Sequence, residues 1–545
     1  MINSISFKNF RRFIDFPKRD LGDITILVGG NNAGKSTLVK AILLMRDFLN
    51  SRIDRVEDTK NIFKTFTRPQ FSFDTEHANI GDFYRAFCRQ SPRKEDTISF
   101  TMTIDKFTFT VNVQGERKSG IIPKVTMLAV SNEYRGVTFT FDFDKGQMTA
   151  LFGYDKEARN NDLTDNYSIE QRIKDLNVAL SKNKNFDEIS KIKLELEQLE
   201  RRAHLISLRD TFAESSEMRV TIDMNYFIGD NVGKMVIPEL IKGFAQYSEI
   251  GILGDKRSKE YKKQEATKSI LKGKKSLILD ISKEIEKVIS SQTIEYIYAH
   301  SVNNSSLYAE CANSRDYTKR TIHEFYTSRI SRGDKKLSIP KDEEFVMIEN
   351  WLDEFGIAKS MKVMPYNGDN YRVVLFDDDN PEIIGERQKG YPGGIDLTDK
   401  GMGSIQLVIL FLRLATLIRK YKGQQLTILL EEPEQNLHPA LQSKLADLLF
   451  EVNRKHGLRF IIETHSEYLV RHSQVIAAKL IYEDGVPLGN VNESIKVYYI
   501  SQKRGVVDML FLDNAKFKDF FDEGFFDQAA REALTISRLE RVYKK

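Results

Sequence analysis

The fold of this chain is decided by the stretch Ile24-Thr25-Ile26-Leu27-Val28-Gly29-Gly30-Asn31-Asn32-Ala33-Gly34-Lys35-Ser36, which continues into a helical pattern over residues 37–49. An apolar, β-branched strand that enters a glycine-rich loop and then a helix is the order of a P-loop. Backbone N–H groups of such a loop surround a phosphate at the helix N-terminus, the lysine reaches the β- and γ-phosphates, and the serine hydroxyl binds Mg²⁺. The sequence therefore predicts a site for ATP or GTP with Mg²⁺. Its expected nucleotide contacts are Gly29, Asn31, Asn32, Ala33, Gly34, Lys35, Ser36 and Thr37.

The bulk composition is that of a large globular protein without a strong charge bias. A chain of 545 residues exceeds one ordinary core, so we expect two or more domains. Its 82 basic and 78 acidic residues leave a net charge of +4, too small to indicate nucleic-acid binding by charge alone. Residues 1–13 alternate like a strand rather than a signal peptide, and the longest apolar stretch, 405–418, is interrupted by Arg413. We expect a cytoplasmic protein without a membrane segment.

A second apolar run, residues 426–430, ends in two acids, and Pro433 stops the strand soon after them. A P-loop needs a partner strand whose terminal carboxylates hold the Mg²⁺ shell and orient the attacking water. We expect Glu431 to support Mg²⁺ and Glu432 to polarise the hydrolytic water. The next apolar strand, residues 459–464, ends at His465. A histidine at that position is expected to contact the γ-phosphate and to sense hydrolysis.

A further glycine-rich segment precedes the acidic strand and opens an apolar helix that ends near Lys422. It reads Asp399-Lys400-Gly401-Met402-Gly403-Ser404-Ile405-Gln406. A glycine-rich helix N-terminus binds anions, but one nucleotide needs only one P-loop. We therefore expect Gly401, Gly403 and Ser404 to contact the γ-phosphate held by a neighbouring subunit. A simple tight turn is the alternative for a Gly-x-Gly pair taken alone.

The order of these motifs resembles that of the ABC-type ATPases, which include transporter motors, structural-maintenance-of-chromosomes proteins, RecF and the overcoming-lysogenization-defect (OLD) family. The signature at 399–406, Glu-Glu-Pro-Glu at 431–434 and Glu-Thr-His-Ser at 463–466 are most similar to the OLD-like branch. That branch places the signature serine directly before the glutamine, whereas Ile405 stands there in this chain. The resemblance implies an α/β ABC-type head, with a mixed sheet, a flanking antiparallel sheet and a helical hairpin insertion. It also implies a homodimer, or a higher oligomer, that encloses two ATP molecules.

The two halves of the site are far apart in sequence, so the residues between them are expected to be inserted domain material. Alternating patterns over 99–113 and 136–143 predict an antiparallel sheet. After Ser168, apolar residues recur every three or four positions on both sides of a short polar break, which predicts two amphipathic helices. The helices are expected to fold back on each other as a hairpin that either projects or packs on the body. The predicted domains are an N-terminal lobe at 1–165, the hairpin at 166–210, a mainly helical region at 211–370 and a C-terminal lobe at 371–545.

Two local features of the predicted insertions bear on ligands. Residues 255–275 hold nine basic and three acidic side chains and are the best candidate for nucleic-acid binding. A solvated lysine-rich helix is the alternative, because Tyr261 is the one aromatic residue among them. Gln70 is a further candidate Mg²⁺ contact, as the glutamine that links the metal to the inserted domain.

The chain is not expected to cut nucleic acid by itself. OLD-family nucleases carry a Toprim domain after the ATPase, whereas 80 residues follow His465 here, and the run Asp377-Asp378-Asp379 has the pattern of an acidic turn. Eight histidines and two cysteines do not build a zinc-supported HNH site. An OLD-like ATPase without Toprim resembles the PtuA-type ATPases of Septu and Septu-like retron anti-phage systems. The resemblance implies an HNH nuclease partner, PtuB, and in retrons a reverse transcriptase with its branched DNA. The alternative is a RecF-like DNA-repair or chromosome-maintenance ATPase that clamps DNA.

Overall fold

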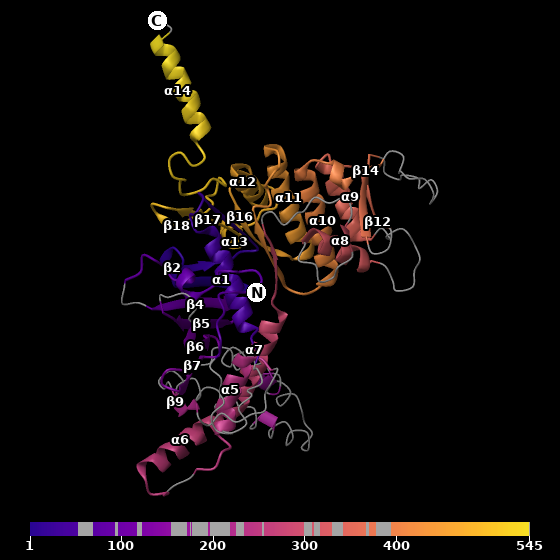
Figure 1. The fold of residues 1–545 in the computed structure, drawn as a ribbon. Coiled ribbons are helices and arrows are strands. Elements are labelled where there is room, and N and C mark those ends of the chain that lie inside the picture. The colour runs from indigo at the N-terminus through magenta and orange to yellow at the C-terminus, as the bar shows by residue number, and fades with distance from the viewer. Residues whose placement is uncertain are drawn as a thin grey trace. The chain divides into compact units, whose positions relative to one another are not determined.

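The computed structural model describes the chain in two compact units (Figure 1). The first contains Met1 and residues 20–40 and 291–545, and the second contains residues 2–19 and 41–290. The P-loop, the acidic strand, the signature and His465 all belong to the first unit, so the candidate site is built within one compact body. The described residues are 1–52, 69–92, 96–116, 123–153, 172–174, 176, 195–196, 218–224, 234–252, 255–298, 308–309, 317–329, 342–366, 370–377 and 394–543.

The first unit is built on a six-stranded sheet in the order β10-β15-β16-β3-β17-β18. The strands are β10 (Thr293–Ile297), β15 (Leu426–Glu431), β16 (Arg459–Thr464), β3 (Ile24–Gly29), β17 (Ile495–Ser501) and β18 (Gly505–Asp508). Neighbouring strands pair in parallel from β10 to β17, and β18 is antiparallel to β17. Strands β3, β15 and β16 are buried almost throughout, as parallel strands covered on both faces are. Their carboxyl ends share one edge of the sheet, and the P-loop, the paired acids and His465 follow directly.

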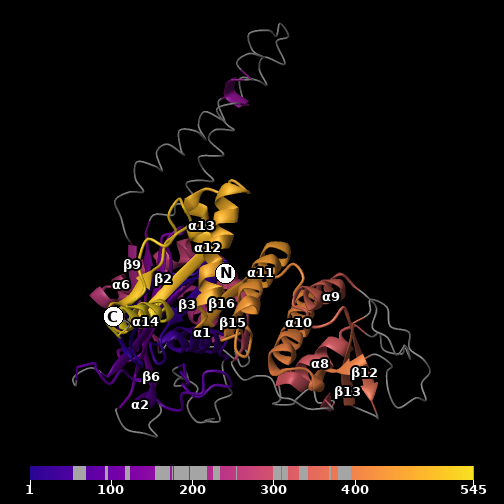
Figure 2. The same cartoon turned by 90° about the horizontal axis from the view of Figure 1, so that it is seen from above.

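Helices of the first unit pack against this sheet and against a smaller one. Helix α11 (Pro439–His456) lies against β16 and packs on α12 (Glu467–Tyr482), and α13 (Leu488–Ser494) contacts α12 and β17 (Figure 2). Helices α8 (Tyr317–Thr327), α9 (Glu343–Glu354) and α10 (Met402–Lys420) pack together beside the smaller sheet. That sheet contains β11 (Tyr308–Ala309), β13 (Asn370–Phe376), β12 (Ser360–Tyr366) and β14 (Gly394–Asp396). The last helix is α14 (Gln528–Tyr543).

Helix α10 is long and apolar enough to cross a bilayer by length and composition, the one such helix among the described residues. In the structure it is a core helix, because thirteen of its side chains are buried. One of them is Arg413, which is ion-paired to Glu295 on β10 and to Glu324 on α8. Removing one partner from a buried ion pair costs about 3–5 kcal/mol. The signature helix is therefore tied to its neighbours by charge as well as by apolar packing.

The second unit is built on an eight-stranded sheet in the order β2-β1-β4-β5-β6-β7-β8-β9. Its strands are β2 (Phe13–Asp20), β1 (Ile2–Phe10), β4 (Thr97–Ile104), β5 (Phe107–Gln114), β6 (Lys124–Asn132), β7 (Val137–Asp142), β8 (Gln147–Phe152) and β9 (Met218–Asp223). Pairing is antiparallel from β1 to β9, and burial alternates along β4 and β5. The unit also contains α2 (Phe83–Ala86), α5 (Val236–Tyr247), α6 (Lys259–Gly273), α7 (Lys275–Ser291) and most of α1 (Lys35–Leu49).

The predicted α/β class, with one mixed and one antiparallel sheet, is confirmed, as are the strands predicted at 99–113 and 136–143. The units interleave along the chain: strand β10 and helices α8 and α9, from within the range 211–370, belong to the first unit. Most of the predicted hairpin, 166–210, lies outside the described residues. Of its described residues, Arg172 forms an ion pair with Glu195 at 3.1 Å. The domain boundaries themselves stay a prediction.

Candidate nucleotide-binding and hydrolysis site

The P-loop joins the end of β3 to the start of α1 at Lys35. Gly34 has φ 110°, a left-handed conformation that favours glycine. A Cβ on Gly29 would lie 2.6 Å from the carbonyl oxygen of Ile500 on β17, so the packing of the loop on the sheet also requires glycine there. The first N–H groups of a helix have no acceptor within the helix. The loop therefore presents donors of the kind that bind phosphate.

Lys35 is buried and lies over this loop. Its ammonium donates to the carbonyl oxygens of Gly29 at 3.0 Å and Gly30 at 3.3 Å, and its Nζ lies 2.7 Å from Nε2 of His465. Since an ammonium has no acceptor, Nε2 must accept this hydrogen bond, and the ring proton of a neutral His465 is then on Nδ1. Burial and the nearby charge of Lys35 lower the pKa of His465, which favours that neutral form. Burial also lowers the pKa of Lys35, against the opposing effect of nearby carboxylates.

The two acids at the end of β15 have different surroundings. Glu431 accepts a hydrogen bond from the hydroxyl of Tyr296 on β10 at 2.6 Å, and burial together with this bond raises the pKa of Tyr296. Glu432 is half-buried, and its Oε1 lies 3.4 Å from Nε2 of His465. Its φ of 45° is in the left-handed region, which costs a residue other than glycine about 1–3 kcal/mol and is concentrated at functional sites. The carboxylate predicted to activate water thus lies beside the predicted sensor histidine.

Two further carboxyl groups belong to the cluster and had no predicted role. Glu463 is the penultimate residue of β16 and lies opposite Glu431 in the parallel register, and its Oε1 accepts from the Ser36 hydroxyl at 2.7 Å. Burial raises the pKa of Glu463 to about 7. Glu434 is buried and accepts from the Thr464 hydroxyl at 2.7 Å and from the backbone N–H of His465 at 2.8 Å. Burial raises the pKa of Glu434 as well. A signal for Glu463 was present, because an acid stands one residue before the end of its apolar strand, much as Glu431 stands at the end of β15.

The signature residues begin α10, where Gly401 is the N-cap residue. A Cβ on Gly401 would meet nothing within 4 Å, whereas a Cβ on Gly403 would lie 2.5 Å from the carbonyl oxygen of Asn436. The Gln406 amide donates to the Pro433 carbonyl oxygen at 3.3 Å. Gly403 is therefore required by a contact within the chain, which holds the start of α10 against the turn after Glu432. The contacts of Gly401, Gly403 and Ser404 with a second subunit stay a prediction.

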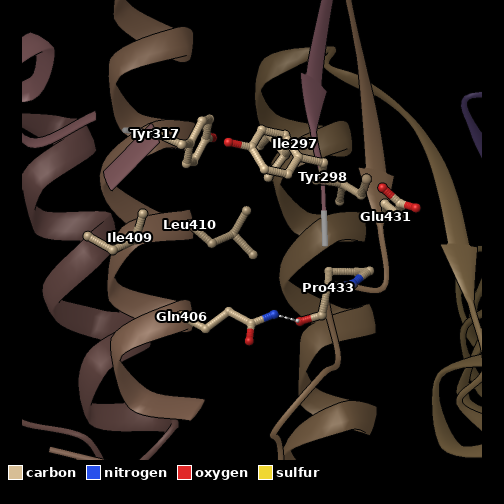
Figure 3. Close-up of a pocket in the computed structure, with 9 residues that line it drawn as sticks. Ile297, Tyr298, Tyr317, Gln406, Ile409, Leu410, Glu431 and Pro433 are labelled. Atoms are coloured by element: carbon tan, nitrogen blue, oxygen red, sulfur yellow. Dashed lines mark hydrogen bonds between the residues drawn. The ribbon is translucent and has the colours of Figure 1, made fainter. Parts of the chain in front are cut away.

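A small pocket lies between α10 and the ends of β10 and β15 (Figure 3). The aromatic rings of Tyr298 and Tyr317 meet edge to face in it, with centroids 5.9 Å apart. Its lining is mostly apolar, which makes it a packing space beside Glu431 rather than a second phosphate site. The lining residues are Ile297, Tyr298, Tyr317, Gln406, Ile409, Leu410, Leu430, Glu431 and Pro433.

Gln70 belongs to the second unit and is exposed. Since the site residues lie in the first unit, the role of Gln70 at the metal stays a prediction. Of the acidic run, Asp377 follows β13, whereas Asp378 and Asp379 lie outside the described residues.

The residues around the P-loop fit nucleotide phosphates with Mg²⁺. A serine hydroxyl and carboxylates are the hard oxygen donors that Mg²⁺ prefers. In the described part of the chain no three acidic, histidine or cysteine groups form a ready metal site, as is usual for Mg²⁺, which also takes substrate phosphate oxygens as ligands. The buried Oε2 atoms of Glu434 and Glu463 have no hydrogen-bond partner among the described residues, which suits a site completed by ligand or water. When bound, Mg²⁺ neutralises charge on the phosphates.

Comparison with known proteins identifies the chain as an ATPase. The sequence model of AAA_15, described as AAA ATPase domain, matches residues 1–470. The comparison with curated proteins found no match. Similar solved structures include an Smc head domain with a coiled coil and joint from Pyrococcus yayanosii, at 11% identity and a TM-score of 0.32, covering 94% of this chain and 98% of that one. Another is the SMC head domain from Thermotoga maritima, at 10% identity and a TM-score of 0.28, covering 91% and 94%. Likeness of this size assigns no function. By its match over most of its length, the chain belongs to the AAA ATPase domain family AAA_15.

Proposed function

We propose that this chain is the ATP-hydrolysing regulatory subunit of a cytoplasmic anti-phage defence complex. In this proposal a homodimer, or a higher oligomer, closes around ATP and controls a separately encoded HNH nuclease. The ATPase part rests on the contact of Lys35 with His465 beside Glu432, at one edge of the parallel sheet. The defence part is supported by the resemblance of the motifs to the OLD-like branch and to PtuA-type ATPases. A retron-type complex would also contain a reverse transcriptase with its branched DNA.

In this proposal each residue of the site has a separate role in ATP hydrolysis. Lys35 would exchange its carbonyl and imidazole partners for the β- and γ-phosphate oxygens, and Ser36 would hold the metal through its hydroxyl oxygen. Glu432 accepts a proton from the attacking water, which is the role of a general base. When the Lys35 ammonium binds the phosphates, His465 loses its contact with Lys35. The imidazole is then free to contact the γ-phosphate. Glu434 holds the backbone of His465 and so fixes where the ring lies.

Dimerisation is supported by the start of α10. Gly401 and Met402 are exposed, and no side chain caps the first N–H groups of this helix. These groups are donors of the kind that bind phosphate, and the chain has one P-loop motif. The second helix start would therefore serve the nucleotide of a partner subunit, which makes ATP the bridge between two chains.

The experiment that tests the regulatory role is purification of tagged Glu432→Gln protein from its native host, with ATP present. Mass spectrometry and sequencing then identify the protein and nucleic acid that co-purify. We expect an HNH nuclease whose binding or activity changes between ATP-bound and nucleotide-free protein. Lys35→Ala is the matched control, because it should not respond to ATP. A nuclease that binds the two variants equally and is equally active with and without ATP would contradict the mechanism.

DNA clamping is a second candidate function, favoured by helix α6 and the residues that flank it. In this segment, 255–275, six basic side chains are exposed, and Leu271 is the one buried residue of α6. Lys268 is engaged instead with the Ile250 carbonyl oxygen and the Tyr247 ring. An exposed basic helix can neutralise phosphates, and binding would weaken steeply with salt. The exposed basic residues are Lys256, Arg257, Lys259, Lys262, Lys263 and Lys272.

The two functions are separated by the response of ATPase activity to duplex DNA. The clamp requires DNA to stimulate hydrolysis and requires the stimulation to disappear when Lys262, Lys263 and Lys272 are replaced by Gln. Glu260 and Glu265 replaced by Gln are the control on the same helix and should not weaken binding. Absent or salt-insensitive DNA binding would count against the clamp and leave the nuclease-regulating function.

A further inference from the structure

Glu463 is a buried carboxylate in direct contact with the P-loop serine. The residue is 4% exposed, and its Oε1 accepts a hydrogen bond from the Ser36 hydroxyl at 2.7 Å. The other oxygen, Oε2, is buried and has no hydrogen-bond partner among the described residues. An unpaired buried carboxylate oxygen is costly, so its persistence beside a phosphate and metal site indicates a partner supplied by the bound state.

The order of the strands explains why this residue, rather than Glu431, reaches Ser36. Strand β16 pairs with β3, the strand that leads into the P-loop, whereas β15 lies one strand further away. Glu463 therefore lies near the carboxyl end of the strand that pairs with β3, which leads into the P-loop. Glu431 is instead engaged on its other side by the Tyr296 hydroxyl, at 2.6 Å. The two carboxylates lie at the same level of adjacent strands but hold different groups.

We propose that Glu463 is a positioning residue of the magnesium site: it holds the Ser36 hydroxyl and offers its free oxygen to the water shell of the metal. The role that the motif assigns to Glu431 alone is thus divided between two neighbouring strands. The Glu431 carboxylate is oriented by a hydrogen bond from Tyr296, and the Glu463 carboxylate by a hydrogen bond from Ser36 of the P-loop. This inference requires an ATPase and does not depend on which nuclease or nucleic acid the complex engages.

The test uses Mn²⁺ as the metal probe and the Glu463→Gln variant of the full chain. The amide keeps the size of the side chain and an oxygen that accepts from Ser36, but removes the charge. Electron paramagnetic resonance titration measures Mn²⁺ affinity in the presence of ATP, and a fluorescent ATP analogue in EDTA measures metal-free binding. Because loss of an outer-shell partner typically costs about 10–100-fold in metal affinity, we expect a loss of that size. Metal-free ATP binding should be unchanged or tighter, since a negative charge near the phosphates is removed.

Glu467→Gln is the matched control, because Glu467 lies four residues further on and pairs with Arg471 on the surface. It should leave Mn²⁺ affinity unchanged. An Mn²⁺ affinity of Glu463→Gln within twofold of the parent protein overturns the inference. A loss of metal-free ATP binding overturns it too, because Glu463 would then shape the P-loop itself. If this variant does not fold, Glu463→Asp replaces it: its shorter carboxylate cannot hold Ser36, and an unchanged Mn²⁺ affinity is again the contrary result.

Discussion

Two helices begin at a glycine-rich segment of the first unit, and the surroundings of the two helix starts differ. At the start of α1, Lys35 is 3% exposed and contacts His465, and Ser36 is held by Glu463. At the start of α10, Gly401 has open space around it and Met402 is 43% exposed. The first helix start is enclosed by groups of its own chain, and the second is open. Similar glycine patterns thus occur in two settings, one helix start enclosed by its own chain and one that is open, as the proposed contact with a second subunit requires.

The largest effect on the enclosed site is expected for Glu432→Gln. The amide cannot take a proton from water, and general-base catalysis contributes about 10²–10⁴-fold in rate. We therefore expect kcat to fall by about that factor while ATP remains bound, because Lys35 and the P-loop are intact. Steady-state hydrolysis and equilibrium binding of a fluorescent ATP analogue measure the two quantities. Glu467→Gln is the control, and hydrolysis above a tenth of the parent rate would assign the base to another group.

The next largest effect is expected for Lys35→Ala. Two charge-assisted contacts to phosphate are lost, each contributing about 1.5–3 kcal/mol, which corresponds to at least about 100-fold in Kd. Isothermal titration with ATP and Mg²⁺ measures this change. Lys40→Ala, on the same helix but one turn further on, is the control and should bind ATP like the parent protein. Retained affinity in Lys35→Ala would mean that the enclosed helix start is not the primary phosphate site.

The proximity of Lys35, Glu432 and His465 could be predicted from sequence because each of them follows closely after an apolar strand. The strand preceding Lys35, the strand preceding Glu432 and the strand preceding His465 were each recognised by composition. Parallel strands end at the same edge of a sheet, so the segments that follow them lie close together even when they are far apart in the chain. Lys35 and His465 are 430 residues apart, yet the pattern of strands predicted that they belong to one site.

The partners of these residues could not be predicted in the same way. That Tyr296 holds Glu431 depends on β10 being the neighbour of β15, and the pairing of β10 with β15 is a tertiary choice that no local pattern records. The contact of Ser36 with Glu463 depends in turn on β16 lying between β15 and β3. The anion-site role of Gly403 stays a prediction, but the close approach of Asn436, which requires glycine there, could not be predicted from a local pattern. Strand order and close packing therefore limited the prediction, rather than missing motifs.

A pair of glycine variants tests whether the open helix start is half of a site. Gly403→Ala should destabilise the chain by about 1–3 kcal/mol, because its Cβ would clash with the Asn436 carbonyl oxygen. Gly401→Val should cost less stability than Gly403→Ala, since its space is open and its backbone is extended, so that only the N-cap preference for glycine over valine is lost, but it should impair hydrolysis across the dimer. Thermal unfolding and steady-state hydrolysis separate the two outcomes.

Complementation sharpens the same test. Mixing Gly401→Val with Lys35→Ala should restore one intact site per heterodimer, so that the mixture hydrolyses ATP faster than either variant alone. Gly423→Val is unsuitable as a control because Gly423 has φ 77°, whereas Gly489→Ala is suitable because its surroundings are open. If the mixture is no more active than its components, the start of α10 does not serve a second subunit.

The smallest effect is expected for Tyr296→Phe, which tests how the carboxylates around the enclosed helix start divide their work. The variant removes the Tyr296 hydroxyl that donates a hydrogen bond to Glu431, and a net hydrogen bond contributes about 0.5–1.5 kcal/mol, or roughly two- to tenfold in affinity. Mn²⁺ affinity in the presence of ATP should fall by no more than that factor. Tyr298→Phe, two residues further along the chain, is the control and should leave Mn²⁺ affinity unchanged. Because Glu463 contacts Ser36 directly and Tyr296 acts through Glu431, the loss in Tyr296→Phe must be smaller than in Glu463→Gln. The reverse order would mean that β15, rather than β16, carries the carboxylate on which metal binding mainly depends.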